Sequence, residues 1–319
     1  MAKRHPWTEA EIPSQDGKRV LITGANSGIG LATARALAAR DAQVILACRS
    51  EEKARQAMAD IREHYPRARL HFLQLDLANL SSVAHLAELF FEHYDRLDLL
   101  VNNAGVMWLP EGRTADGFER QLGTNHLGHF ALTGRLLPAL LKQPGSRVVT
   151  VSSLAHRGGR LNFDDLFFER HAYGKHRAYC QSKLANLVFA LELDRRLNQA
   201  GSQTLSLAAH PGITDTNLGA PRSGQGREPL AMRLARKVSP MVLQSAAKGA
   251  LPSLYAATAQ AVKGGDYFGP DGPYEAFGYP APAHRSGRAR NPDIGRQLWQ
   301  ASEQLTGVVY PFPSQSAVA

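Results

Sequence analysis

Tyr179 and Lys183 are two residues whose chemistry could be used together. They stand four positions apart in a helical pattern, which places them one turn apart on the same face. That face is otherwise largely apolar, and an inward-facing lysine is unfavourable unless its charge is used. An ammonium group beside a phenol favours the phenolate, so the pair is suited to proton transfer. This spacing is common, however, and alone it identifies no site.

A glycine-rich turn at residues 23–30 contains Gly24, Gly28 and Gly30. An apolar run leads into it, and an alanine-rich helical pattern follows. Such a strand, turn and helix direct backbone N–H groups and a helix N-terminus at one point, which suits a pyrophosphate. Gly24 permits the turn, Gly28 allows close approach of the phosphates, and Gly30 allows the helix to pack on the strand. The alternative is a glycine-rich turn without a ligand.

The residues that follow the second and third apolar runs bear on the choice of nucleotide. Proteins that hold an unphosphorylated ribose usually place Asp or Glu about 20 residues beyond the glycines. Arg49 holds this place here, and a planar cation suits a 2′-phosphate. We therefore expect NADP(H) to be preferred over NAD(H), the alternative being a solvated surface arginine. Asp76, followed by Leu77, could accept from an adenine amino group or lie in an ordinary loop.

Small and polar residues end two further expected strands. Asn103, Ala104 and Gly105 follow the apolar run at residues 97–101. Small side chains there would let the backbone approach a cofactor, and a simple strand-ending turn is the alternative. Ser153 follows the run at 147–151 and is separated from Tyr179 by an inserted stretch, residues 154–177, which we expect beside the pocket.

Asn125 lies in a long helical stretch that we expect over residues 115–141. A buried amide needs hydrogen-bond partners, so Asn125 is either a structural amide of the core or part of a site. The glycines at 123, 128 and 134 each weaken a helix by about 1 kcal/mol relative to alanine, so tight packing must hold this one. No third ligand stands at metal-site spacing from His126 and His129, and we expect no metal. The predicted shared face consists of Phe118, Leu122, Asn125, His129, Leu132 and Leu136.

Apolar runs alternate with helical patterns along the chain, which predicts right-handed βαβ units and a parallel sheet. The expected strands are residues 19–23, 43–48, 70–75, 97–101 and 147–151, a sixth strand that ends before Pro211, and a last edge strand with its turn at 264–270. The expected helices are residues 28–40, 51–65, 81–94, 115–141, 244–261 and 297–305, with a further helix opening at Tyr179. We predict one Rossmann-like, doubly wound α/β domain at 18–319, with an N-terminal arm at 1–17 and a C-terminal, substrate-side elaboration.

The bulk composition is typical of a soluble globular protein. The net charge of +9 includes no block of five like charges, and aromatic residues are not interleaved with Lys and Arg, so nucleic acid is not an expected partner. Cys48 and Cys180 form no CxxC pair, which excludes a disulfide framework and fits a reducing, cytoplasmic location. No apolar run approaches the ~18 residues that span a bilayer.

Taken together and in this order, the motifs resemble those of the short-chain dehydrogenase/reductase family. The resemblance covers residues 18–218, and it implies an enzyme that reduces carbonyls or oxidises alcohols with NADP(H) or NAD(H). The matching residues are 23–30, 102–105, Asn125, Ser153, Tyr179, Lys183 and 206–212. Residues 106–107, 114–118, 125–130, 152–156 and 179–186 resemble the retinol-dehydrogenase-like branch.

The resemblance also implies roles for individual residues. Tyr179 would exchange a proton with the substrate oxygen, and Lys183 would lower the phenol's pKa from about 10 and bind the nicotinamide ribose. Ser153 would orient the substrate oxygen, and Asn125 would hold a water that links Lys183 to solvent. The turn at 211–216 would receive the nicotinamide carboxamide, unless it is a plain Pro-Gly turn. The expected cofactor-binding residues are Gly24, Asn26, Ser27, Gly28, Ile29, Gly30, Arg49, Asp76, Leu77, Asn103, Ala104, Gly105, Tyr179, Lys183, Pro211, Gly212, Thr214 and Thr216.

Residues 229–238 are expected to form a basic amphipathic helix within a segment, 219–242, that would cover the pocket as a lid. Contact with an anionic membrane surface is the alternative. We expect an apolar small-molecule carbonyl or alcohol as substrate and leave a homo-oligomer open. A cofactor-binding regulator without turnover is the second functional hypothesis.

Overall fold

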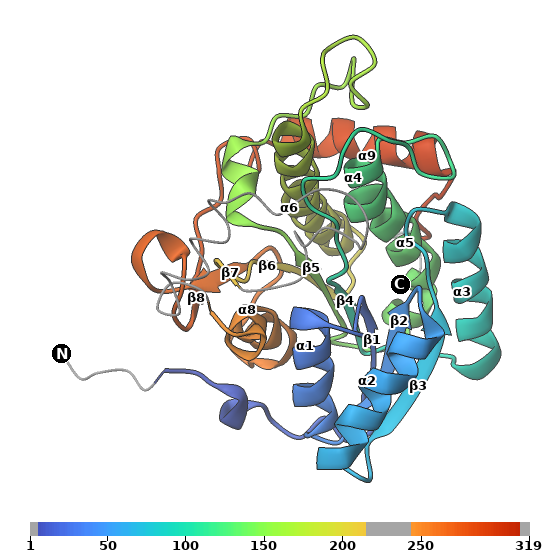
Figure 1. The fold of residues 1–319 in the computed structure, drawn as a ribbon, viewed down its shortest axis with the longest axis vertical. Helices are drawn as coiled ribbons and strands as arrows, with labels where there is room; N and C mark the ends of the chain where they lie inside the picture. The colour runs from blue at the N-terminus through green and yellow to red at the C-terminus, as the bar shows by residue number, and fades with distance from the viewer. Residues whose placement is uncertain (1–5, 215–243, 313–319) are drawn as a thin grey trace.

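The computed structural model describes residues 6–214 and 244–312. Its centre is an eight-stranded sheet in the order β3-β2-β1-β4-β5-β6-β7-β8 (Figure 1). Neighbouring strands from β3 to β7 pair in parallel, and β8 pairs antiparallel with β7. The strands are β1 (Arg19–Thr23), β2 (Gln43–Cys48), β3 (Arg69–Gln74), β4 (Leu99–Asn102), β5 (Arg147–Val151), β6 (Leu205–Ala209), β7 (Tyr267–Pro270) and β8 (Pro280–Pro282).

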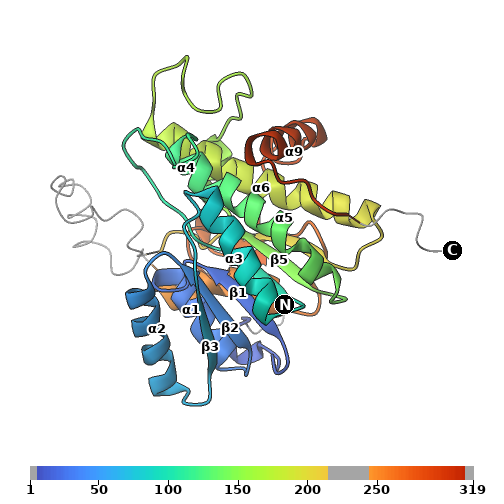
Figure 2. The same cartoon turned by 90° about the vertical axis from the view of Figure 1, so that its right-hand side faces the viewer.

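Helices cover both faces of this sheet (Figures 1 and 2). They are α1 (Gly28–Ala38), α2 (Glu51–His64), α3 (Leu80–His93), α4 (Arg120–Leu122), α5 (Gly128–Leu141), α6 (Lys175–Gln199), α8 (Ala246–Thr258) and α9 (Pro292–Thr306). One apolar core joins the sheet to α1, α2 and α8, and a second joins it to α3, α5 and α6. α9 packs on α6, on the side away from the sheet. The arrangement confirms the predicted doubly wound α/β fold.

The position of β1 shows where a ligand would bind. β2 and β3 extend the sheet on one side of β1, and β4 to β8 extend it on the other. In open α/β sheets, ligands bind outside the carboxyl ends of the strands at this reversal of strand order. The ends of β1 and β4 are therefore the expected centre of the site.

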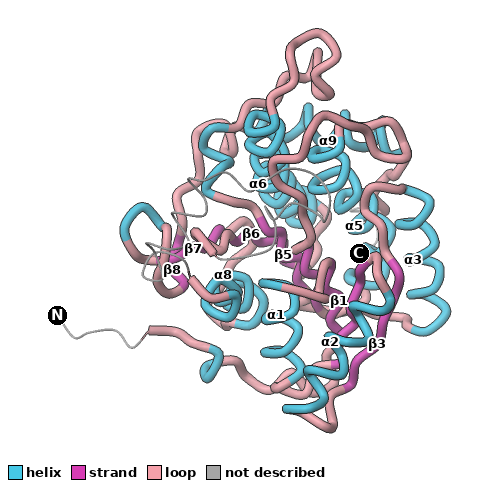
Figure 3. The backbone as a smooth tube through the Cα atoms, in the orientation of Figure 1, coloured by secondary structure: helices cyan, strands magenta, loops and turns pink. Residues whose placement is uncertain are grey.

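The helix predicted over residues 115–141 begins later, at Arg120, and contains an irregular turn. Figure 3 shows where helices, strands and loops lie along the backbone. The Glu119 carboxylate caps α4 by accepting from the backbone N–H groups of Gln121 and Leu122 at 2.8 and 2.7 Å. A π-helical turn, η2 (Gly123–Leu127), then separates α4 from α5. Because a π turn holds an extra residue, the predicted single face is wrong: Leu122 packs with α6, whereas Leu132 packs with α3.

The tight packing predicted for this glycine-rich helix is confirmed. A Cβ at Gly128 would lie 2.3 Å from the carbonyl oxygen of Leu77, and one at Gly134 would lie 2.6 Å from the ring of Tyr310. Because backbone oxygens cannot move away as a flexible side chain can, Gly128 sets how closely α5 approaches the end of β3.

Other differences from the prediction concern the ends of elements. α6 begins at Lys175, one turn before Tyr179. α9 begins at Pro292, capped by the Asn291 side chain, five residues before the predicted helix at 297–305. In the N-terminal arm, the ring of Trp7 lies edge-on to Tyr255 of α8, at 5.2 Å between centroids.

Within residues 6–214 and 244–312, no helix combines the length and apolar character needed to cross a membrane. The predicted helix at 229–238, the lid at 219–242 and Thr216 all lie outside the described residues.

Candidate active site

The glycine-rich turn has the backbone that its sequence predicts. Gly24 and Gly28 have positive φ values of 66° and 53°, which favour glycine. A Cβ at Gly30 would lie 2.3 Å from the carbonyl oxygen of Gly24, so this glycine lets α1 pack against the turn. The Ser27 side chain makes no capping hydrogen bond at the start of α1, whereas Ser50 caps α2. The turn, which also includes Asn26 and Ile29, is thus a backbone cradle that fits a phosphate group.

Arg49 and Asp76 follow the neighbouring strands β2 and β3 at the same edge of the sheet. The Arg49 side chain is exposed, and among the described residues it has no carboxylate partner. The nearby Glu51 is engaged by Arg55 at 2.6 Å. Asp76 accepts from the backbone N–H of Ala78 at 3.0 Å and is half-buried, and Leu77 is buried. A cation without a partner beside the turn fits an additional phosphate.

Thr23, the last residue of β1, ties the glycine turn to the turn after β4. Its hydroxyl oxygen accepts from the N–H groups of Asn103 and Ala104, both at 2.9 Å, and lies 2.9 Å from His129 Nε2. His129 Nδ1 lies 2.8 Å from the carbonyl oxygen of Asn125, which can only accept. Nδ1 therefore carries the proton, and Nε2 accepts from the Thr23 hydroxyl. Burial lowers the pKa of His129 to about 4 and keeps the ring neutral.

Thr23 and His129 were missed as members of the site. The sequence feature that could have identified Thr23 is a hydroxyl residue at the end of an apolar strand, directly before Gly24. For His129, the sequence predicts packing in a helix, and the structure adds a bridge between two turns of the site.

Asn125 joins the turn after β4 to α6. Its amide nitrogen donates to the carbonyl oxygen of Val106 and to Ser182 Oγ, both at 2.9 Å, and its amide oxygen accepts from Val106 N at 2.8 Å. All of these bonds lie within the protein, so the side chain fixes structure at the site. The predicted water link to Lys183 stays a prediction, and the second lone pair of Asn125 Oδ1 or the backbone carbonyl oxygen of Asn125 could accept from such a water.

Lys183 is almost entirely buried beside Asn125. Its side chain is 5% exposed, and Nζ donates to the carbonyl oxygen of Val151 at 3.2 Å. A Cβ at Gly105 would lie 3.5 Å from Lys183 Nζ and 3.3 Å from Asn125 Oδ1, so the turn after β4 approaches both groups closely. Burial lowers the pKa of the Lys183 ammonium to about 8.

Tyr179 lies next to Lys183, with Nζ 5.8 Å from the centre of its ring. Burial raises the pKa of Tyr179 to about 12, and hydrogen bonding with Ser153 offsets this only in part. The predicted lowering depends on Lys183 together with the charge of an oxidised nicotinamide, and it stays a prediction. The side chain is 8% exposed, which explains why desolvation prevails. The phenol is therefore protonated at neutral pH.

Ser153 follows β5 and caps the short helix η3 (Leu154–Gly158) by accepting from the N–H of Ala155 at 3.2 Å. The inserted stretch that comes next lies against the turn after β4. Tyr173 OH donates to the carbonyl oxygen of Leu109 at 3.0 Å, and the rings of Trp108 and His176 meet at 4.8 Å.

The turn after β6 is held by the C-terminal part of the chain. Gly212 has a positive φ of 70°, and a Cβ there would lie 2.3 Å from the carbonyl oxygen of Ala276. Thr214 Oγ1 donates to the carbonyl oxygen of Pro211 at 3.0 Å. β5 and β6 are neighbours, with Ser152 N donating to the carbonyl oxygen of Ala209 at 2.8 Å, so this turn and the Ser153 turn lie at the same sheet edge.

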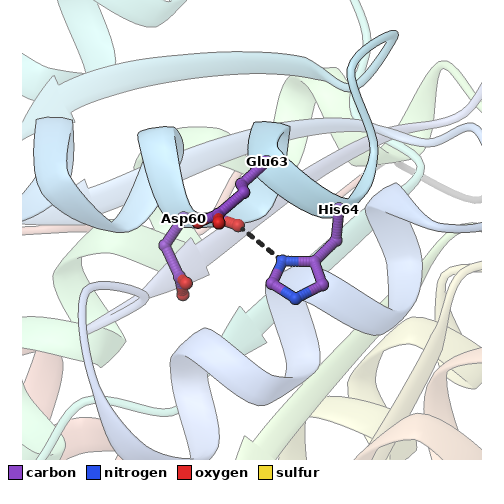
Figure 4. A group of neighbouring side chains, drawn as sticks. All are labelled: Asp60, Glu63 and His64. Atoms are coloured by element: carbon purple, nitrogen blue, oxygen red, sulfur yellow. Dashed lines mark hydrogen bonds between the residues drawn. The ribbon is translucent and has the colours of Figure 1, made fainter.

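One group with metal-ligand chemistry occurs in the described part of the chain, and it lies on α2, away from this edge (Figure 4). It consists of Asp60, Glu63 and His64. Asp60 is paired with Arg35, and His64 Nδ1 lies 3.1 Å from the carbonyl oxygen of Asp60. Exposed side chains with these partners form an ordinary helix surface, and we assign no metal to them.

Comparison with known proteins agrees with this geometry. Residues 18–225 match the family model described as short chain dehydrogenase. The chain is 41% identical over 306 residues to human retinol dehydrogenase 13, covering 95% of this chain and 88% of that protein. It is 41% identical over 303 residues to mouse polyprenol dehydrogenase, covering 93% of this chain and 86% of that protein.

Solved structures give the same result. A crystal structure of an uncharacterised protein from Mycobacterium paratuberculosis matches with a TM-score of 0.80 and 43% identity, covering 96% of this chain and 100% of that one. A short chain dehydrogenase from Shigella flexneri, solved with NADP, matches with a TM-score of 0.62 and 27% identity, covering 81% of this chain and 98% of that one. The chain therefore belongs to the short-chain dehydrogenase/reductase family, in its retinol-dehydrogenase-like branch, and is an NAD(P)-dependent oxidoreductase that acts on CH–OH groups.

Proposed function

We propose that the protein is an NADP(H)-dependent oxidoreductase that transfers a hydride between the nicotinamide and an apolar carbonyl or alcohol substrate, with Tyr179 as acid and base. The observation that carries the proposal is the meeting of Tyr179, Lys183 and Ser153 at the carboxyl edge of the sheet, beside the glycine-rich turn. When bound, the dinucleotide supplies or accepts the hydride. The protein supplies position and a proton.

Tyr179 suits the proton-donating direction. Reduction of a carbonyl builds negative charge on its oxygen, which needs a proton as the C–H bond forms. A phenol whose pKa is about 12 carries that proton at neutral pH. In the reverse direction Tyr179 must first lose it, and a positive charge brought next to the ring favours that loss.

Lys183 and Ser153 complete the proposed machinery. Lys183, with a pKa of about 8, is mostly protonated at pH 7 and provides a cation beside the phenol. It would also hydrogen-bond the nicotinamide ribose. The Ser153 hydroxyl would donate to the substrate oxygen and orient it. Asn125 would support Lys183 through the turn at residues 103–106, and the water link remains part of the proposal.

The dinucleotide would lie along the carboxyl ends of β1 to β6. The pyrophosphate would contact the backbone of the glycine turn, Asp76 and Leu77 would face the adenine, and the turn after β4 would lie along the middle of the molecule. Pro211, Gly212, Thr214 and Thr216 would receive the carboxamide. Arg49 would hold the 2′-phosphate.

Replacing Arg49 by alanine is expected to lower kcat/KM with NADPH about 10- to 100-fold, since a hydrogen bond to a charged group contributes about 1.5–3 kcal/mol. The value with NADH should hardly change, because NADH lacks the 2′-phosphate. Steady-state kinetics with both nucleotides measure this. Arg55→Ala, which removes an arginine already paired with Glu51, is the matched control. An equal loss with both nucleotides would show that Arg49 does not select between them.

Two observations support an apolar carbonyl or alcohol as the substrate. Relatives with about 40% identity are named retinol and polyprenol dehydrogenases, whose named substrates carry long hydrocarbon groups. His176 of the inserted stretch also packs edge-on against Trp108 of the segment after β4, which places aromatic surface there. We place the enzyme in the cytoplasm, as the sequence predicts, and both Cys48 and Cys180 are free thiols.

The direct test is NADPH oxidation by the purified protein with aldehydes of increasing chain length, including retinal. We expect turnover that rises with the apolar length of the substrate. If the protein binds NADPH but consumes it with no aldehyde, and reduces NADP⁺ with no alcohol, then the regulator without turnover is the better assignment.

A further inference from the structure

Glu275 holds together two turns of the candidate site, although it lies far along the chain in the turn between β7 and β8. Its Oε2 atom is 3.0 Å from His210 Nε2 and 2.8 Å from Arg157 Nη2. Its Oε1 atom accepts from the N–H of His284 at 3.0 Å. Burial acts to raise the pKa of Glu275, but hydrogen bonds from His210 and His284, together with the positive charge of Arg157, bring it down to about 2. The carboxylate is therefore charged under all ordinary conditions.

His210 carries this contact to the turn after β6. The ring is fully buried, and Nδ1 accepts from the backbone N–H of Gly212 at 3.2 Å. Nδ1 is thus unprotonated, and the proton sits on Nε2, which donates to Glu275. A Cβ at Gly269 would lie 2.0 Å from Nε2, so glycine on β7 leaves the room that the ring needs. Burial lowers the pKa of His210, so the ring stays neutral. Nδ1 can then accept from Gly212 while Nε2 donates to Glu275.

Arg157 connects Glu275 to the second turn, the one that carries Ser153. It lies on η3, the short helix that Ser153 caps, so the guanidinium and the Ser153 hydroxyl belong to one rigid turn. The adjacent His156 Nδ1 lies 2.7 Å from the carbonyl oxygen of Ser153. The carboxylate therefore fixes the turn that carries Ser153 relative to the turn that carries Gly212.

The backbone of the Glu275 turn supports a specific role for this side chain. Tyr274 and Glu275 both have positive φ values, 55° and 59°. Two successive non-glycine residues in the left-handed region are unfavourable and persist where surrounding contacts hold them. The two hydrogen bonds and the ion pair of the Glu275 carboxylate are such contacts, whereas Tyr274 is 89% exposed.

We propose that Glu275 is a positioning residue, which sets the distance between the hydroxyl of Ser153 and the Pro211–Gly212 turn through Arg157 and His210. The inference rests on the proposed function, because these turns would hold the substrate oxygen and the nicotinamide carboxamide. The contacts of the Glu275 side chain are with His210, Arg157 and His284, so its loss should leave nucleotide affinity largely intact. It should instead disturb the alignment for hydride transfer, where a shift of about 1 Å can lower the rate about 100-fold.

The experiment compares three variants of the full chain. Glu275→Ala removes all three contacts, and Glu275→Gln keeps an acceptor oxygen but removes the charge that pairs with Arg157. Tyr274→Asn is the matched control, because it alters the same turn at an exposed side chain, and asparagine tolerates the left-handed backbone. Urea unfolding first shows that each variant is folded at the assay temperature.

With NADPH and the best aldehyde, we expect kcat to fall about 10- to 100-fold in Glu275→Ala and less in Glu275→Gln, with a larger deuterium isotope effect from deuterated NADPH. The Kd of NADPH should stay close to that of the unaltered protein. The fluorescence of the bound nicotinamide at saturation should fall, since its ring is held less firmly. Tyr274→Asn should match the unaltered protein in every measurement.

Three results would overturn the proposal: unaltered kcat and nicotinamide fluorescence in both folded Glu275 variants, a loss that merely follows the unfolded fraction, or the same loss in Tyr274→Asn. If the unaltered protein turns over no substrate, the proposed function fails, and the nicotinamide fluorescence of the variants still decides the role of Glu275.

Discussion

Replacing Tyr179 by phenylalanine is expected to lower kcat by about 100- to 10,000-fold, the range that general acid–base groups contribute. The substitution removes one oxygen atom from a buried ring and leaves its packing in place. Because Tyr179 acts on the substrate oxygen, the Kd of NADPH should remain close to that of the unaltered protein. Kinetics with the best aldehyde and fluorescence titration with NADPH measure the two quantities separately.

Tyr255→Phe is the matched control for this substitution, since it removes a hydroxyl from a partly buried tyrosine of α8 that packs on Trp7. It should leave kcat unchanged. Turnover by Tyr179→Phe at nearly the original rate, with NADPH bound, would exclude Tyr179 as the proton donor.

Acid is expected to destabilise the protein through its buried histidines, most of all through His126 and His129, whose pKa values burial lowers furthest. Burial lowers the pKa of His126 to about 3 and that of His129 to about 4, against 6.5 for an exposed ring. Below pH 6.5 these histidines bind protons in the unfolded chain, whereas in the folded chain they stay neutral until the pH approaches their lowered pKa values. The free energy of unfolding should therefore fall as the pH drops from 6.5 toward 4, by up to about 1.4 kcal/mol per pH unit for each histidine.

Urea unfolding at a series of pH values measures this slope. His126→Gln should reduce the slope by about the contribution of one histidine, because glutamine does not titrate. Glutamine can still form a hydrogen bond with Ser302, which lies 2.9 Å from His126 Nε2. His85→Gln, at an exposed ring on α3, should leave the slope unchanged. A slope that is the same in all three proteins would show that His126 is not held neutral.

The strands that build the site could be predicted closely from the sequence. β1, β2 and β5 have the predicted bounds, because strands buried on both faces appear as continuous apolar runs. The glycine turn was also predictable from local sequence. Gly24 and Gly28 are needed for their positive φ values, and Gly30 for its close contact with the backbone of Gly24. Arg49 and Ser153 could be singled out because they follow predicted strands, and Tyr179 and Lys183 because they stand one turn apart in a helical pattern; their roles stay predictions.

What the sequence could not predict depends on distant contacts. The π turn at Gly123–Leu127 breaks the periodicity on which the predicted helix face relied. The pKa of Tyr179 rises because neighbouring elements bury the ring, which its local spacing with Lys183 does not reveal. Glu275 meets His210 from a position 65 residues further along the chain, with no local pattern to connect them.

The prolines of β8 have a consequence for how molecules of this protein meet one another. The N–H of Ala283 and the carbonyl oxygen of Tyr279 both bond toward β7, so the residues between them alternate, and Pro280 and Pro282 turn their backbone outward. Proline has no N–H to offer a further strand. The outermost strand therefore gives a second chain little to pair with, and this end of the sheet is protected against growth into aggregates.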